Sequence, residues 1–101
     1  KINDDDAGLS RVDVRRAAAD RRAQVAPLRK AMQSAEKLVE KLSAEVAQRD
    51  AVLADSATYT RDPQKAQRAA LERGQLAKQL AEAEESWLLA TEAFETANSG
   101  G

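Results

Sequence analysis

The sequence contains neither cysteine nor histidine. Without cysteine there is no disulfide and no thiolate nucleophile, and without histidine there is no imidazole for acid–base chemistry or zinc-finger ligation. No apolar run approaches the roughly 18 residues that indicate a membrane-spanning helix. The β-branched residues are few and scattered, so strands are not expected. These absences argue against an enzyme, a metal protein and a membrane-spanning protein.

The residues that are present are those of long helices. Charged residues make up 33% of the 101 residues, and much of the 43% hydrophobic content is alanine. This composition is typical of coiled coils. The formal net charge of −1 argues against a dedicated nucleic-acid-binding domain, which usually carries a clear positive charge.

Two heptad stripes organise the chain, because apolar residues recur at alternating intervals of three and four. The first stripe comprises Val14, Ala18, Arg21, Val25, Leu28, Met32, Ala35, Val39, Leu42, Val46, Arg49 and Leu53. The second comprises Ala66, Ala69, Arg73, Leu76, Leu80, Ala83, Trp87, Ala90, Phe94 and Ala97. We predict an all-α fold, a two-helix antiparallel coiled-coil hairpin with helices at 11–54 and 63–97 and a non-helical tip at 55–62.

Local signals mark the ends of these helices. Ser10 is placed to cap the first helix, and the pair Asp62-Pro63 is a typical helix start. Pro27 lies inside the first helix, where it removes a backbone donor, so we predict a kink or a break there. Residues 1–10 are predicted to form a flexible acidic linker cut from a longer protein, and residues 98–101 a tail.

Folding about the tip is expected to pair residues whose numbers add to about 116. Leu28 then lies opposite Trp87, and Arg29 is a natural partner of Glu84. The predicted neighbours are a basic stretch, 11–30, with a net charge of +5, and an acidic stretch, 82–95, with a net charge of −5. Such surface pairs stabilise little but help to set antiparallel register.

Two arginines interrupt the stripes at similar distances from the tip. Facing each other, Arg49 and Arg73 would repel, so we predict a local shift of packing that moves Val52 and Leu71 inward. Gly74, a poor helix former, lies at the same place.

Several ordered features resemble the C-terminal coiled-coil domain of the ABC-F ATPases of the Uup and YheS type. They are the segment Ala26–Lys30, the tip Leu53–Tyr59, Asp62-Pro63, and Glu84–Leu88 with its late tryptophan. The resemblance covers nearly all of residues 11–97. It implies a cytoplasmic bacterial protein that acts on ribosomes or, in some members, on DNA. ATP and magnesium would bind in cassettes outside this chain, so we expect no cofactor here.

Basic residues on the first helix are candidates for contacting nucleic acid. Arg15, Arg22 and Arg29 recur every seven residues, and a row of cations can track phosphates without reading bases. The further candidates on this helix are Arg16, Lys30, Lys37 and Lys41. The alternative is that these cations only solvate the helix and pair with glutamates of the second helix.

The tip carries a second candidate group. Tyr59 can stack on a base while Arg61, Lys65 and Arg68 meet phosphates. We favour the alternative for Tyr59, in which the ring packs across the turn and closes the end of the hairpin.

The remaining large apolar residues have structural interpretations. Trp87 and Phe94 are predicted core residues, whose bulk fits beside Pro27 and Leu28. Leu71, Leu88 and Leu89 fall off the stripes and are either ordinary exposed leucines or docking residues.

These observations define the expected function. We expect a non-catalytic arm of an ABC-F ATPase that contacts ribosomal RNA or DNA and its own ATPase domains. The alternative is a structural coiled coil that docks on those domains or dimerises. We expect no membrane partner, no metal and a monomer, with a weak dimer as the alternative.

Overall fold

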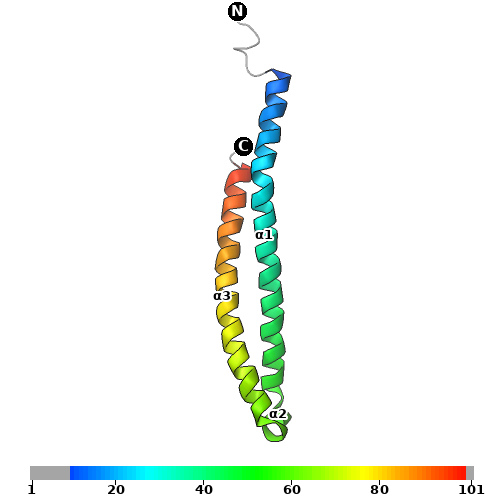
Figure 1. Ribbon diagram of the computed structural model, residues 1–101, viewed down its shortest axis with the longest axis vertical. Coiled ribbons are helices and arrows are strands. Elements are labelled where there is room, and N and C mark those ends of the chain that lie inside the picture. Colours follow the sequence, from blue (N-terminus) through cyan, green and yellow to red (C-terminus); the bar gives the residue numbers. More distant parts are fainter. Residues whose placement is uncertain (1–9, 100–101) are drawn as a thin grey trace, which may run out of the picture.

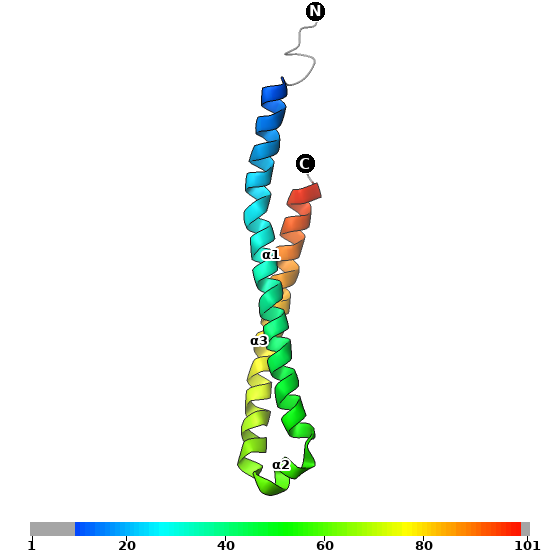
Figure 2. The same ribbon diagram turned by 90° about the vertical axis from the view of Figure 1, so that its right-hand side faces the viewer.

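The computed structural model describes residues 10–99, which form three helices. Helix α1 spans Arg11–Ala54, α2 spans Ser56–Arg61 and α3 spans Pro63–Ser99. Figures 1 and 2 show α1 and α3 running antiparallel along each other, with α2 at the tip. No strand occurs among the described residues. The predicted all-α helical hairpin is therefore confirmed.

Side-chain caps explain where the two long helices begin. The Ser10 hydroxyl oxygen accepts a hydrogen bond from the Asp13 backbone N–H at 3.1 Å. The Asp62 carboxylate accepts one from the Lys65 N–H at 3.1 Å. Each cap satisfies a first-turn donor that has no partner inside the helix, and Pro63 stands where its missing N–H is not needed. Both predicted starts are correct.

The tip is more ordered than the sequence suggested. Residues 55–62 were predicted to be non-helical, but Ser56–Arg61 form α2. Asp55 makes this possible because its carboxylate accepts from the Ala57 N–H at 3.0 Å. The Asp62 N–H then donates to the Thr58 carbonyl at 2.8 Å and ends the helix. Two aspartates thus define a six-residue helix between the long ones.

Helix α1 continues through Pro27 without a break. Of the two predicted alternatives, the break does not occur. Proline removes only one backbone donor, and the helix on both sides packs on α3 through Val25 and Leu28, which are buried and half-buried. At the other end, Asn98 and Ser99 belong to α3 rather than to the predicted tail. Residues 1–9 and 100–101, which make up most of the predicted linker and tail, lie outside the described residues.

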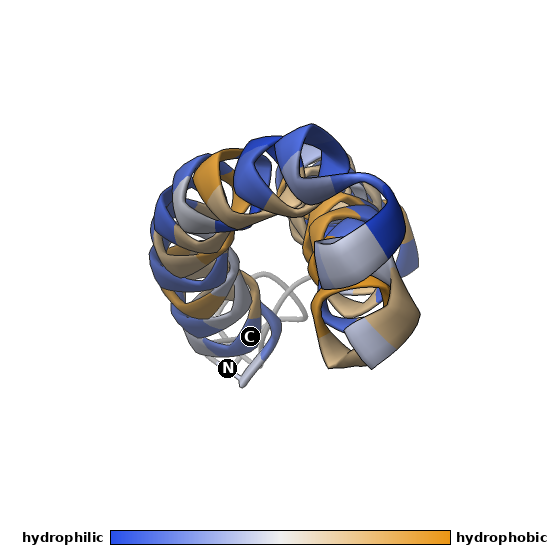
Figure 3. Ribbon diagram, turned by 90° about the horizontal axis from the view of Figure 1, so that it is seen from below, coloured by the Kyte–Doolittle hydropathy of each residue, from blue (hydrophilic) through white to orange (hydrophobic). Residues whose placement is uncertain are grey.

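The core is a single seam between α1 and α3. Its buried residues are Val25, Leu42, Ala66, Ala69 and Ala83. Most other residues of the two predicted stripes are half-buried, as expected when two helices cover each other on one side only. The exceptions are Val14, Arg21 and Arg73, which are exposed. Figure 3 looks along the long axis and shows hydrophilic residues recurring along the outer sides of the helices.

The helices pair in a different register from the predicted one. The contacts Arg49–Glu72, Asp50–Arg73 and Arg29–Phe94 join residues whose numbers add to 121 or 123 rather than 116. The reason lies at the tip, where α2 packs mainly against α3 and lets α3 start beyond the end of α1. The predicted pairs of Trp87 with Leu28 and of Glu84 with Arg29 are therefore wrong.

The register leaves the start of α1 without a partner helix. In this register Ser99, the last residue of α3, lies opposite residues 22–24. Figure 1 shows α1 continuing past the end of α3. Residues 11–22, here named the α1 extension, span about 18 Å at 1.5 Å per residue.

Candidate nucleic-acid interface

The candidate cations of α1 all lie on its exposed surface. They are Arg15, Arg16, Arg22, Arg29, Lys30, Lys37 and Lys41. Each residue of the heptad row Arg15, Arg22 and Arg29 directly follows a stripe position, so the row runs along the flank of the seam. The other four lie further round the helix. The structure thus distributes these charges along α1 and gathers none of them into a pocket of its own.

Arg29 is engaged within the chain. Its guanidinium carbon lies 5.4 Å from the centroid of the Phe94 ring, a cation–π geometry. The contact covers one face of the Phe94 ring while the guanidinium keeps its charge. Arg29 therefore has a structural role that the other members of the row do not share.

The tip cations separate into two places. Arg61 is exposed on α2, whereas Lys65 and Arg68 lie on the first turns of α3. Together with Arg49 and Glu72, the two α3 cations line a shallow hollow of about 210 Å³ between the helices. The predicted tip group is thus only partly brought together.

Tyr59 does not close the end of the hairpin. Its side chain is 51% exposed, whereas the neighbouring Ala57 and Thr58 are half-buried. The favoured interpretation, a ring packed across the turn, is therefore wrong in its main feature. Formation of α2 explains the difference, because a helix turns the inner face of the tip toward Ala57 and Thr58. Half of the ring is left accessible to a partner.

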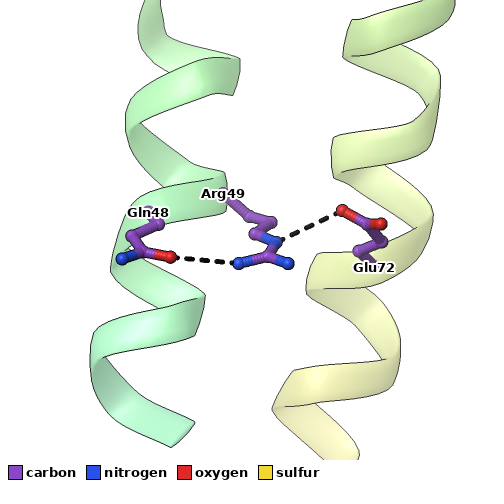
Figure 4. A network of polar contacts seen from close by, with 3 residues as sticks. All are labelled: Gln48, Arg49 and Glu72. Atoms are coloured by element: carbon purple, nitrogen blue, oxygen red, sulfur yellow. Dashed lines mark hydrogen bonds and ion pairs between the residues drawn. The ribbon is translucent and has the colours of Figure 1, made fainter. Parts of the chain in front are cut away.

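The two arginines predicted to repel are instead neutralised by crossed ion pairs. Arg49 Nε donates to Glu72 Oε1 at 3.2 Å, and Arg73 Nε donates to Asp50 Oδ1 at 2.7 Å. Figure 4 shows Arg49 between Glu72 and Gln48, whose Oε1 accepts from Arg49 Nη1 at 3.1 Å.

These ion pairs replace the predicted repacking. Leu71 is 65% exposed, so its predicted inward movement is wrong, while Val52 is half-buried. The sequence-based prediction placed Arg49 opposite Arg73 but considered the two arginines alone, and so missed the acids beside them, Asp50 and Glu72.

A hollow of about 500 Å³ lies where α3 ends beside α1. It is lined by Ala18, Arg21, Arg22, Val25, Ala26, Arg29 and Asn98. Its floor is apolar and its rim carries arginines, so it suits an apolar group with negative charge beside it. The apolar stripe and the heptad row of arginines were both predicted from the sequence. They line a hollow only because α3 ends beside them.

Two polar atoms on α3 are buried without a hydrogen-bond partner. They are Trp87 Nε1 and Thr91 Oγ1, one helical turn apart. Trp87 and Phe94 are both half-buried at the seam, as predicted for core residues. An unpaired buried polar group costs about 1–3 kcal/mol, so these residues reduce the stability of the seam.

Exposed leucines occur where the stripes predicted them. Leu88 and Leu89 are 56% and 60% exposed, in the middle of the acidic stretch 82–95, here named the acidic segment. Its five glutamates are exposed as well. Leu38, 47% exposed, was not singled out from the sequence because it directly precedes a stripe position and gave no separate signal.

Within residues 10–99, no group of three or more acidic side chains is arranged to hold a metal ion. In the same part of the chain no helix combines the length and apolar character needed to cross a membrane. What the arrangement offers chemically is therefore charge and apolar contact on the outside of a rod.

Comparisons with protein-family models, with curated proteins and with solved structures gave no match.

Proposed function

We propose that the chain is a non-catalytic C-terminal arm of an ABC-F ATPase of the Uup and YheS type, and that it contacts nucleic acid through the cations of α1. The observation that carries this proposal is the exposed cationic surface of a long rod, without a convergent catalytic site among residues 10–99. The ordered sequence features shared with that family add support. ATP would bind in the parent's cassettes, and the proposed location is the cytoplasm.

The mode of contact follows from the chemistry of the cations. Arginine and lysine side chains on one helix bind phosphates by charge and release counterions, which gives affinity without base specificity. The half-exposed Tyr59 at the tip adds a ring on which an unpaired base can stack. RNA with single-stranded loops and duplex DNA are both suitable ligands.

Fluorescence anisotropy across a salt series tests this function. The probes are a labelled DNA duplex, a branched DNA and a ribosomal RNA hairpin. Replacing Arg15, Arg22, Lys30 and Lys37 together by glutamine is expected to lower affinity and reduce the salt slope by about 0.9 per lost phosphate contact. Lys78→Gln, an exposed cation on α3, is the control. Absence of binding at low salt, or equal binding by the quadruple variant, contradicts direct contact.

A second candidate function is a protein-interaction coiled coil, which docks on its own ATPase domains or dimerises. The exposed Leu88 and Leu89 favour it, because they are large apolar side chains that the seam does not bury. In this case the anisotropy experiment gives no binding for any of the three probes.

A further inference from the structure

We infer that two copies of this chain associate through the ends of their hairpins that lie opposite the tip. The α1 extension of each copy packs against the acidic segment of the other. The inference does not depend on nucleic-acid binding. It begins with an unpaired helix face. Val14 on the α1 extension belongs to the heptad stripe but is 52% exposed. Within residues 10–99, the stripe thus continues past Ser99, the last residue of the helix that covers it.

Charge identifies the kind of helix that fits this face. The α1 extension holds five arginines and two aspartates, a net charge of +3. Two extensions packed on each other would repel. The face therefore needs an acidic helix with exposed apolar residues, since such a helix supplies both complementary charge and contact area.

The chain itself carries such a helix surface. The acidic segment has a net charge of −5 with no basic residue, and it exposes Leu88 and Leu89. Within one copy residues 82–95 lie opposite the middle of α1, and only the end of the α1 extension, at Arg21 and Arg22, comes near α3. The charges nearer the start of the extension can meet the acidic segment of a second copy.

The geometry permits a closed, symmetric dimer. The acidic segment is about 21 Å long and the α1 extension about 18 Å, so they match in length. When a second copy is turned to point the opposite way, each extension runs beside the other copy's α3 near its end. Both contacts then form by one two-fold axis, and no surface is left open for chain growth.

Sedimentation equilibrium of the whole chain over a wide concentration range tests the dimer. We expect reversible dimers at low salt that weaken at high salt, because the charges are near the surface. Leu88→Glu combined with Leu89→Glu is expected to raise the dissociation constant by about tenfold or more, because carboxylates that must stay hydrated replace the apolar side chains of the contact. The matched control is Leu71→Glu, equally exposed on α3 but outside the acidic segment.

A charge exchange makes the test specific for the two surfaces. Arg15→Glu with Arg22→Glu is expected to weaken the dimer, as is Glu85→Arg with Glu92→Arg. All four substitutions together should restore association, because the complementarity is reversed. Circular dichroism checks that each variant stays helical.

A wild-type chain that stays monomeric at millimolar concentration overturns the proposal, as does a dimer that Leu71→Glu weakens as much as the leucine pair. Nucleic-acid binding can fail while the dimer persists, so the two proposals are judged separately.

Discussion

Individual side chains on α3 show where this hairpin is less than optimally packed. Thr91 Oγ1 and Trp87 Nε1 are buried but make no hydrogen bond, and both lie on the face turned to α1. The other buried seam residues of α3 are alanines, whose side chains offer no polar partner. We therefore expect that these two unpaired polar atoms, rather than a lack of apolar bulk, limit the stability of the seam.

Thr91→Val tests this expectation. Valine keeps the β-branched shape and removes the unpaired hydroxyl, so the free energy of unfolding should rise by about 1 kcal/mol. Urea unfolding followed by circular dichroism measures the change. Thr96→Val, at an exposed position five residues further on, is the control and should change little. A loss of stability in Thr91→Val would show that the hydroxyl has a partner.

Leu42→Ala measures the strength of the seam itself. Leu42 is 6% exposed, the most buried large side chain of α1 together with Val25. Its truncation should cost about 2–3 kcal/mol, at the lower end for leucine because a two-helix seam can partly close around the gap. Leu71→Ala is the matched control, and should stay within about 0.5 kcal/mol of the wild type because Leu71 is exposed. Equal effects in the same unfolding assay would contradict the assigned seam.

At the scale of the elements, capping residues decide where helices begin, whereas helix-breaking residues do not end the helices that contain them. Ser10 and Asp62 define helix starts through single hydrogen bonds, whereas Pro27 and Gly74 lie inside helices that continue past them. A helix that packs along its whole length tolerates a residue of poor propensity, because tertiary contacts outweigh the local cost.

Gly74→Ala is expected to stabilise α3. A Cβ at residue 74 would meet no atom within 4 Å, so alanine fits without a clash. The gain should be about 1 kcal/mol, the difference in helix propensity between the two residues. Thermal unfolding by circular dichroism should show a higher midpoint. An unchanged or lower midpoint would mean that the glycine serves a bend that alanine resists.

At the scale of the whole molecule, the crossed ion pairs and the tip together set the register. Arg49–Glu72 and Asp50–Arg73 lie side by side, and each arginine is held by the acid next to the other arginine. A slip of one heptad would separate all four charges from their partners. The register in turn decides that residues 11–22 extend beyond α3 as the basic α1 extension.

Reversing one charge of this network should destabilise the hairpin, and reversing both should restore it. Arg73→Glu places an acid opposite Asp50, with an expected loss of about 1 kcal/mol because the pair is exposed. Adding Asp50→Arg should recover most of the loss in the same unfolding assay. Lys78→Glu, another exposed cation on α3, is the control. If the double variant is no more stable than the single one, the ion pair does not exist in solution.

Much of the fold follows from local pattern. The alternating intervals of three and four residues between apolar positions predict both long helices and their inner faces. Ser10 and Asp62-Pro63 predict where these helices begin. The helical tip was missed because α2 depends on capping by Asp55 and on packing against α3, which no periodicity reveals. The break at Pro27 was wrong for the same reason, since contacts beyond the local sequence hold α1 together.

The candidate site likewise has a part that the sequence predicts and a part that it does not. That Arg15, Arg22, Leu88 and Leu89 are exposed was predictable, because each lies off the stripes. That Arg29 covers Phe94 and that Tyr59 is half-exposed was not, since both depend on register and on the helical tip.

The sequence alone determined that this protein is a pair of long helices folded back on each other, because heptad spacing and capping act over a few residues. Only the tertiary structure decided how far one helix slides along the other, because a heptad stripe accepts several registers of similar burial. The choice among them came from the tip helix and the crossed ion pairs. Both bring together residues that are distant in sequence, and neither follows from composition or period.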